Sequence, residues 1–156
     1  MRNNRLRLIS GSRSLRLDPT DGQEMLAKAT DVFRYIDSNF ERWHCNLLAR
    51  PTTITAVQVY ELARDSTFQE MFDCFGVKIG RLALTQGQIE QFAKRCSNWL
   101  KSGGNGTFFL FENDHEYFVA AVYYFSDGRL GVRIRRLTLE RSFRAEKRHR
   151  LVVKSC

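Results

Sequence analysis

Arginine is the residue type whose number and spacing in this chain point most directly to chemistry. Its guanidinium group keeps its charge and donates paired hydrogen bonds to phosphate. Residues 1–17 hold five arginines and no acid, and residues 129–156 hold ten basic residues against two acids. We expect the following basic side chains to contact the phosphates of a nucleic acid: Arg2, Arg5, Arg7, Arg13, Arg16, Arg133, Arg135, Arg136, Arg141, Arg144, Lys147, Arg148 and Arg150.

The positive charge is confined to the two ends of the sequence. The whole chain carries +8, of which residues 1–17 supply +5 and residues 129–156 supply +8, so residues 18–128 are left with −5. A basic arm and a basic segment are typical of proteins that meet a polyanion. The distribution favours a nucleic-acid partner, RNA or a ribonucleoprotein first, with an acidic protein as the alternative partner.

Aromatic residues lie beside some of these arginines in the expected sheet. A two-residue hairpin loop at Asp127-Gly128 would place Val122 opposite Arg133 and Ala120 opposite Arg135. One face of the sheet would then carry Arg133 and Arg135 beside four aromatic residues: Phe109, Phe111, Phe118 and Tyr124. An open face of this kind stacks unpaired bases. The favoured alternative is that a helix crosses the face and buries its rings, because soluble proteins rarely leave so large an apolar patch bare.

Catalytic and metal-binding patterns are weak. The four cysteines contain no C-x-x-C pair, and His44-Cys45 is their only local cluster with histidine. The triplet Asp114-His115-Glu116 lies where a hairpin turn is expected, and polar residues are common in turns. We therefore expect a protein without catalytic residues, metal or cofactor, and a small hydrolase or nuclease is the weakest of the hypotheses.

Helices are expected in the first two thirds of the chain. Apolar residues recur every three or four positions from Met25 to Leu48, which predicts a long amphipathic helix after Asp18-Pro19. A second helical region is expected over about 55–75, broken near Asp65-Ser66-Thr67, with a capping box at Ser66 and Gln69 and a stop at Gly76. A third should follow the capping box of Thr85 and Gln88 and end before Gly103.

Strands are expected after Gly103-Gly104-Asn105-Gly106. Three segments rich in β-branched and aromatic residues, 107–112, 117–125 and 129–137, predict an antiparallel meander, and 150–154 predicts a further short strand. The sequence therefore predicts an α+β fold in which three or more helices pack on one face of a small antiparallel β-meander, with basic terminal extensions. We expect a basic arm over 1–17, a helical part over 18–102, and the sheet with a basic C-terminal segment over 103–156, residues 18–156 forming one domain.

A set of short segments in the second half of the chain resembles small uncharacterised bacterial proteins. These segments are Leu84-Thr85-Gln86, Trp99-Leu100, 107–111, Phe118-Val119-Ala120, 127–130 and 146–150. The resemblance implies a bacterial or phage-like origin and no particular activity.

The location expected from the sequence is the cytoplasm. Every apolar stretch is interrupted by charge well before the ~20 residues that a membrane span needs, and scattered cysteines are typical of a reducing compartment. An Arg-rich, acid-free N-terminus also fits an organelle presequence, which is the alternative. The composition leaves the oligomeric state open.

Overall fold

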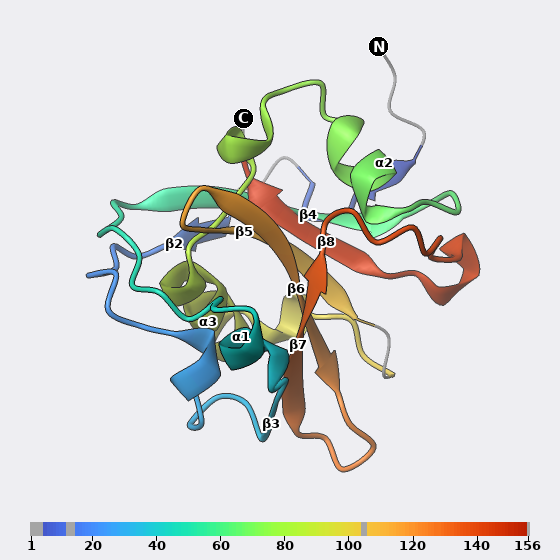
Figure 1. The fold of residues 1–156 in the computed structure, drawn as a ribbon. Helices are drawn as coiled ribbons and strands as arrows, with labels where there is room; N and C mark the ends of the chain where they lie inside the picture. Colours follow the sequence, from blue (N-terminus) through green and yellow to red (C-terminus); the bar gives the residue numbers. More distant parts are fainter. Residues whose placement is uncertain (1–4, 12–14, 104–105, 156) are drawn as a thin grey trace.

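A single mixed β-sheet organises the molecule (Figure 1). The computed structural model describes residues 5–11, 15–103 and 106–155. Within these residues the sheet has eight strands in the order β1-β4-β8-β5-β6-β7-β3, and β2 also pairs with β4. The strands are β1 (Leu6–Leu8), β2 (Leu15–Leu17), β3 (Tyr35–Ile36), β4 (Thr55–Leu62), β5 (Thr107–Asn113), β6 (Glu116–Tyr124), β7 (Leu130–Arg136) and β8 (Arg150–Lys154).

Helical structure is short and divided between the two faces of the sheet. The described residues form the α-helices α1 (Asn39–Arg42), α2 (Phe68–Asp73) and α3 (Gln86–Arg95). They also form the single 3-10 turns η1 (Leu26–Lys28), η2 (Ile79–Arg81), η3 (Ser97–Trp99) and η4 (Ala145–Lys147). The α+β class is confirmed, but the small, purely antiparallel meander is wrong, because the meander is one part of a larger mixed sheet.

Helix α3 is the element that the sequence predicts best. Thr85 Oγ1 accepts a hydrogen bond from the Gln88 backbone, and the Gln88 side chain accepts one from the Thr85 backbone, which is the expected capping box. Helix α2 also begins with a capping box, but it is formed by Thr67 and Glu70, one residue after the predicted pair. Both helices are therefore fixed by signals that lie within their own first turn.

The predicted long helix over 18–48 is wrong. This segment forms η1, the two-residue strand β3 and the single turn α1, joined by irregular chain. Asp37 instead ties the segment to its own backbone and to the sheet: Asp37 Oδ1 accepts from Asn39 N, and Asp37 Oδ2 accepts from Ile134 N of β7. Tertiary contacts therefore override the helical spacing of the apolar residues.

The first half of the predicted second helix, 55–62, is also wrong, because it forms the strand β4. Val57 and Val59 point into one core, and Leu62 points into the core on the other face. This period of two is the strand pattern. On one edge β4 pairs with β1 and β2, so the described part of the basic N-terminal segment belongs to the sheet.

The meander β5-β6-β7 is confirmed, but the register of its second hairpin differs from the prediction by one residue. Phe125 N donates to Arg129 O at 2.8 Å and Gly128 N donates to Phe125 O at 2.9 Å, which closes a three-residue loop. Gly128 has a φ of +81°, the left-handed position that such loops need. Val122 therefore pairs with Val132 and Ala120 with Ile134, so every β7 side chain lies on the opposite face from the one predicted.

Both faces of the sheet are covered, each by its own hydrophobic core. The first core joins β4–β7 to α3, η1 and α1, and it includes Phe92, Phe109 and Phe118. The second joins the other face to α2 and includes Phe68, Phe108 and Leu110. Figure 1 shows α1 and α3 together near β7 and β3, and α2 apart from them beside β4. The expectation that the helices lie on one face is therefore wrong.

Candidate nucleic-acid interface

An exposed cluster of aromatic and arginine side chains lies at the free end of the β6–β7 hairpin. Tyr123 and Phe125 come from the end of β6, Arg133 and Arg135 from β7, and Tyr35 from β3, which pairs with β7. We call these five residues the hairpin surface. The Phe125 ring centroid lies 3.9 Å from that of Tyr35 and 4.8 Å from that of Tyr123, so three rings form one continuous group.

Gly131 makes room for this group of rings. It lies on β7 opposite Tyr123 and beside Tyr35 of β3. A Cβ atom at this position would lie 3.0 Å from the Tyr123 ring and would overlap the Phe125 ring. Because glycine has no side chain, the two rings can approach the β7 backbone closely, and they lie there tilted to each other by 56°.

Two arginines of β7 lie next to the rings. Arg133 Nε donates to Tyr123 Oη at 2.9 Å, and the Arg133 guanidinium lies 4.8 Å from the centre of the Tyr123 ring. Arg135 forms an ion pair with Asp37 at 3.9 Å. Because Asp37 also accepts the Ile134 backbone N–H, it fixes the edge of β7 and holds Arg135 beside the rings.

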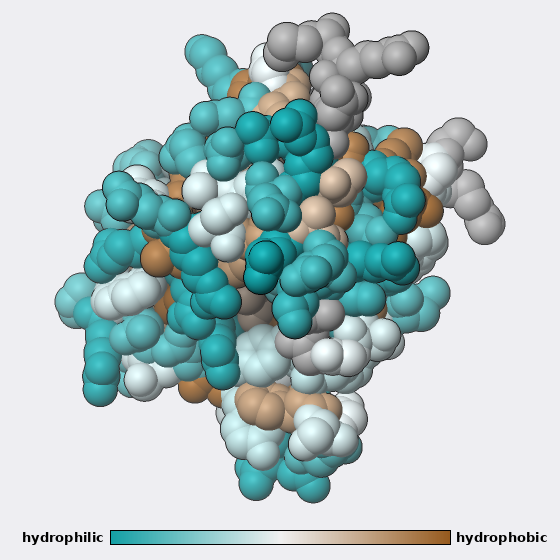
Figure 2. Space-filling model, turned by 90° about the vertical axis from the view of Figure 1, so that its right-hand side faces the viewer, coloured by the Kyte–Doolittle hydropathy of each residue, from teal (hydrophilic) through white to brown (hydrophobic). Residues whose placement is uncertain are grey.

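The hairpin surface borders a hollow of about 400 Å³. The five residues line it together with Ile36, Asp37 and Asn39. Tyr35 is 43% exposed and Arg133 is exposed, whereas Tyr123, Phe125 and Arg135 are half-buried. Figure 2 shows that one side of the molecule is mainly hydrophilic, with a hydrophobic spot on its lowest projection, which is the hairpin end.

A basic segment lies on the same side of the sheet. Residues 137–149, which we call the basic crossover, lead from β7 past β6 and β5 to β8. Phe143 and His149 anchor this segment, because their rings pack on Phe108 at centroid distances of 4.9 Å each. Phe108 pairs with Ala121, and Ala121 pairs with Arg133 of the hairpin surface. Two strand spacings, about 10 Å, therefore separate the two regions.

The charges of the basic crossover point to solvent. Its four exposed cations are Arg141, Arg144, Lys147 and Arg148, of which Arg144 also forms an ion pair with Glu146 at 3.6 Å. His149 is shielded instead: burial lowers its pKa, against the hydrogen bond with Gly106 O, and the positive charges of Arg141, Lys101 and Lys147 lower it further. The crossover thus presents its arginine and lysine charges while an uncharged imidazole holds it on the sheet.

No protein-family model, curated protein or solved structure matches the chain.

Three of the four predicted stacking residues are not accessible. Phe109 and Phe111 are fully buried and Phe118 is 4% exposed, as expected if helices cover that face. Tyr124 is half-buried, and its hydroxyl donates to Ser97 O at 3.2 Å. The rings of the hairpin surface are instead Tyr35, which is exposed, and Tyr123 and Phe125, which are half-buried; none of the three was among the predicted stacking residues. A three-residue loop over Ser126-Asp127-Gly128 was the signal for them, because it places Tyr123 and Phe125 beside Arg133 and Arg135.

The predicted phosphate contacts of the N-terminal segment divide into three groups. Arg5 forms an ion pair with Glu70 at 2.9 Å, and Arg7 forms one with Glu61, so both charges have acidic partners. Arg16 is exposed on β2. Arg2 and Arg13 lie outside the described residues. The N-terminal arginines are thus not gathered with those of the hairpin surface by any described contact.

Two further predicted residues pack against tryptophans. The Arg136 guanidinium lies 4.4 Å from the centre of the Trp43 ring on the opposite face of the sheet from Arg133 and Arg135. Arg150 is half-buried and donates to Trp99 O at 2.8 Å. Neither residue belongs to the hairpin surface. The predicted C-terminal cations therefore lie in three places: Arg133 and Arg135 on the hairpin surface, four cations in the basic crossover, and Arg136 and Arg150 apart from both.

Groups for catalysis are sparse in the described part of the chain. No three His, Cys, Asp or Glu side chains lie together in a way that could hold a metal ion there. Burial raises the pKa of Cys45 to about 11, so its thiol is protonated at neutral pH. His115 is exposed, and its ring nitrogen lies 3.8 Å from Glu112. No described helix is long and apolar enough to cross a membrane.

Proposed function

We propose that the protein is a non-enzymatic accessory protein that binds single-stranded nucleic acid, RNA in preference to DNA, on the hairpin surface and the basic crossover. The observation that carries the proposal is the group of three exposed or half-buried rings with two arginines of β7 next to it. Aromatic rings stack on unpaired bases of any sequence, and the adjacent arginines contact the phosphates. Four further cations lie in the basic crossover, whose anchoring rings pack on the same face of the sheet.

The lengths and burial of the helices favour a single-stranded ligand and disfavour a duplex that is read in its major groove. Helices α1 and α2 have four and six residues, and the first turn of α3 is buried against η1. Reading the major groove requires an exposed helix or ribbon that enters it. The exposed feature here is a ring-bearing sheet face, which is the kind of surface that reads unpaired bases.

The stacking half of the proposal is tested with Tyr35→Ala. Tyr35 is the most exposed ring and lies in a two-residue strand, so its removal should leave the fold unchanged. Loss of one stacked base costs about 1–3 kcal/mol, which is about a 5- to 150-fold loss of affinity. The measurement is a fluorescence titration of labelled single-stranded RNA and DNA of mixed sequence, and Tyr60→Ala on β4 serves as the matched control.

The phosphate half is tested by the salt dependence of the same titration. Each neutralised phosphate of a single strand contributes about −0.7 to the slope of log K against log salt concentration. Lys147→Gln with Arg148→Gln should therefore reduce the slope by about 1.4, whereas Lys28→Gln with Arg50→Gln should leave it unchanged. If the wild-type protein binds neither RNA nor DNA at low salt, the proposal is wrong, and an acidic protein becomes the partner to test.

A further inference from the structure

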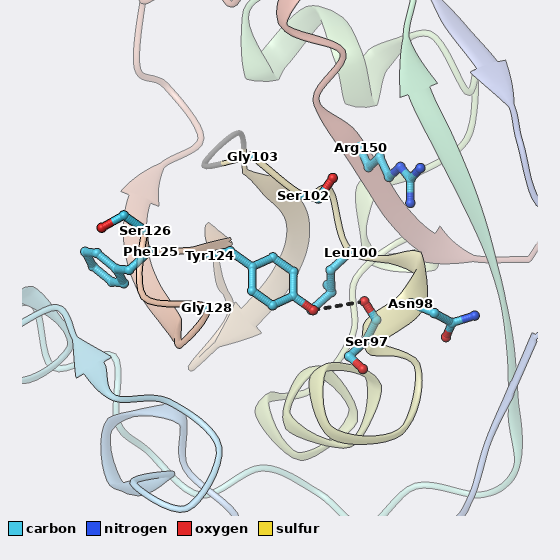
Figure 3. A pocket seen from close by; sticks show the side chains of 10 residues that line it. All are labelled: Ser97, Asn98, Leu100, Ser102, Gly103, Tyr124, Phe125, Ser126, Gly128 and Arg150. Carbon is cyan, nitrogen blue, oxygen red and sulfur yellow. Dashed lines mark hydrogen bonds between the residues drawn. The ribbon is translucent and has the colours of Figure 1, made fainter.

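A second pocket opens on the other side of the hairpin end (Figure 3). Its volume is about 790 Å³, within the usual range for sites that hold a small molecule. One wall is the chain after α3, and the other is the end of the β6–β7 hairpin. It is lined by Ser97, Asn98, Leu100, Ser102, Gly103, Tyr124, Phe125, Ser126, Gly128 and Arg150.

The lining combines flat apolar surface with polar groups. Figure 3 shows the Tyr124 ring reaching from the hairpin toward Leu100 and Ser97, so that the ring spans the space between the walls. Its hydroxyl is already bonded to Ser97 O, which holds the ring in place. The Ser102 hydroxyl and the Asn98 amide are exposed and supply hydrogen-bonding groups. This arrangement suits a planar ring with polar substituents.

Arg150 supplies a cation on this pocket's lining. One of its terminal nitrogens donates to Trp99 O at 2.8 Å, which fixes the guanidinium. Its Nε is buried, and no polar atom of the described residues bonds to it. None of the described carboxylates forms an ion pair with Arg150. Because this Nε has no exposed surface, a ligand in the pocket would meet the terminal nitrogens of the half-buried guanidinium, and an anionic oxygen is the acceptor that suits them best.

We infer that this pocket binds one nucleotide, with its phosphate at Arg150 and its base against Tyr124 and Leu100. The pocket matches a nucleotide in its size, its flat apolar surface, its hydroxyl and amide groups and its single fixed cation. Phe125 borders both this pocket and the hairpin surface, so the nucleotide is either free or part of a strand bound next door. The inference does not depend on strand binding, because the pocket has its own cation.

The experiment is a calorimetric titration of the full chain with the 5′-monophosphates of adenosine, guanosine, cytidine and uridine, and separately with the four nucleosides and inorganic phosphate. Two variants change the pocket: Arg150→Gln removes the cation, and Ser102→Phe fills the space from an exposed position that the fold tolerates. Arg133→Gln, on the hairpin surface, is the matched control. Thermal unfolding checks that each variant is folded.

We expect saturable binding of at least one nucleoside monophosphate with one site per chain, and at least tenfold weaker binding of its nucleoside. Arg150→Gln and Ser102→Phe should each weaken this binding at least tenfold, and Arg133→Gln should leave it unchanged. If no mononucleotide binds, but both pocket variants weaken the binding of single-stranded RNA in the fluorescence titration, the bound nucleotide is part of a strand. If no mononucleotide binds saturably and both pocket variants bind RNA as tightly as the wild type, the inference is wrong, and the proposal for the hairpin surface stands. If a mononucleotide binds in the pocket but single-stranded RNA and DNA do not bind, the proposed function is wrong and the inference about the pocket stands.

Discussion

Phe109 and Phe125 allow stability and binding to be separated, because they lie on adjacent strands but on opposite faces of the sheet. Phe109 is fully buried, and its ring centroid lies 5.4 Å from that of Phe92 on α3 in an edge-to-face contact. Phe→Ala at such a position costs about 3–5 kcal/mol. For a domain of this size each kcal/mol lowers Tm by about 2–4 °C, so we expect Phe109→Ala to lower Tm by about 6–20 °C.

Phe125→Ala should affect RNA binding more than stability. The half-buried Phe125 ring contacts the Tyr35 and Tyr123 rings, and each exposed ring pair contributes about 0.5–1.5 kcal/mol. Losing the two ring contacts therefore costs about 1–3 kcal/mol of stability besides the burial of the half-buried ring, and it takes away the centre of the hairpin surface. We expect Phe125→Ala to weaken RNA binding at least fivefold, and folded Phe109→Ala to bind RNA as the wild type does at 10 °C.

The assay is thermal unfolding of both variants followed by RNA titration at a temperature where each is folded. A double-mutant cycle of Phe92→Ala and Phe109→Ala should add a coupling of about 0.5–1.5 kcal/mol from the ring pair. The packing argument is refuted if Phe109→Ala lowers Tm by less than about 2 °C. It is equally refuted if folded Phe109→Ala loses more RNA affinity than Phe125→Ala.

Two further predictions concern groups that hold the fold together. Because burial keeps the His149 pKa below its ordinary value of 6.5, the unfolded chain binds a proton first as pH falls, so acid should destabilise the wild type below about pH 6.5 by up to about 1.4 kcal/mol per pH unit. His149→Phe should lose less Tm between pH 7.5 and 5.5, and an equal loss would contradict the assignment. Gln86→Leu should cost about 1–3 kcal/mol in urea unfolding, because Gln86 Oε1 accepts the buried Leu26 N–H at 2.9 Å. A cost under 0.5 kcal/mol would show that another group takes over that bond.

Local signals in the sequence predicted the elements that local contacts stabilise. The capping box of Thr85 and Gln88 lies within four residues, and it marks α3 correctly. The strands β5–β8 were found because their β-branched and aromatic composition suits a sheet whatever their partners are. The sequence alone could not show that β8 pairs with both β4 and β5, because that pairing joins residues about 45 to 100 positions apart.

The prediction of a helix for the segment 18–50 was wrong because side chains distant in sequence form hydrogen bonds with its backbone groups. Gln86 accepts from Leu26 N and donates to Leu47 O, and Asn113 donates to His44 O and accepts from Leu47 N. These hydrogen bonds replace those of a helix, and the sequence near residues 26 and 47 contains no pattern that indicates them. In the candidate site the error was smaller in sequence and larger in effect: one extra loop residue at Ser126 moved Arg133 and Arg135 to the opposite face.

The position of β8 has a consequence for how the chain folds during synthesis. β8 lies between β4 and β5 and is the only strand that joins β1, β2 and β4 to β5, β6, β7 and β3 in the described sheet. Because translation runs from the N-terminus, β8 leaves the ribosome after the strands on both of its sides. Until then β4 and β5 each present an open edge lined by residues such as Val59 and Phe109. Such edges pair readily with other chains. A pause in translation between β7 and β8 would therefore prolong the most aggregation-prone stage in the life of this protein.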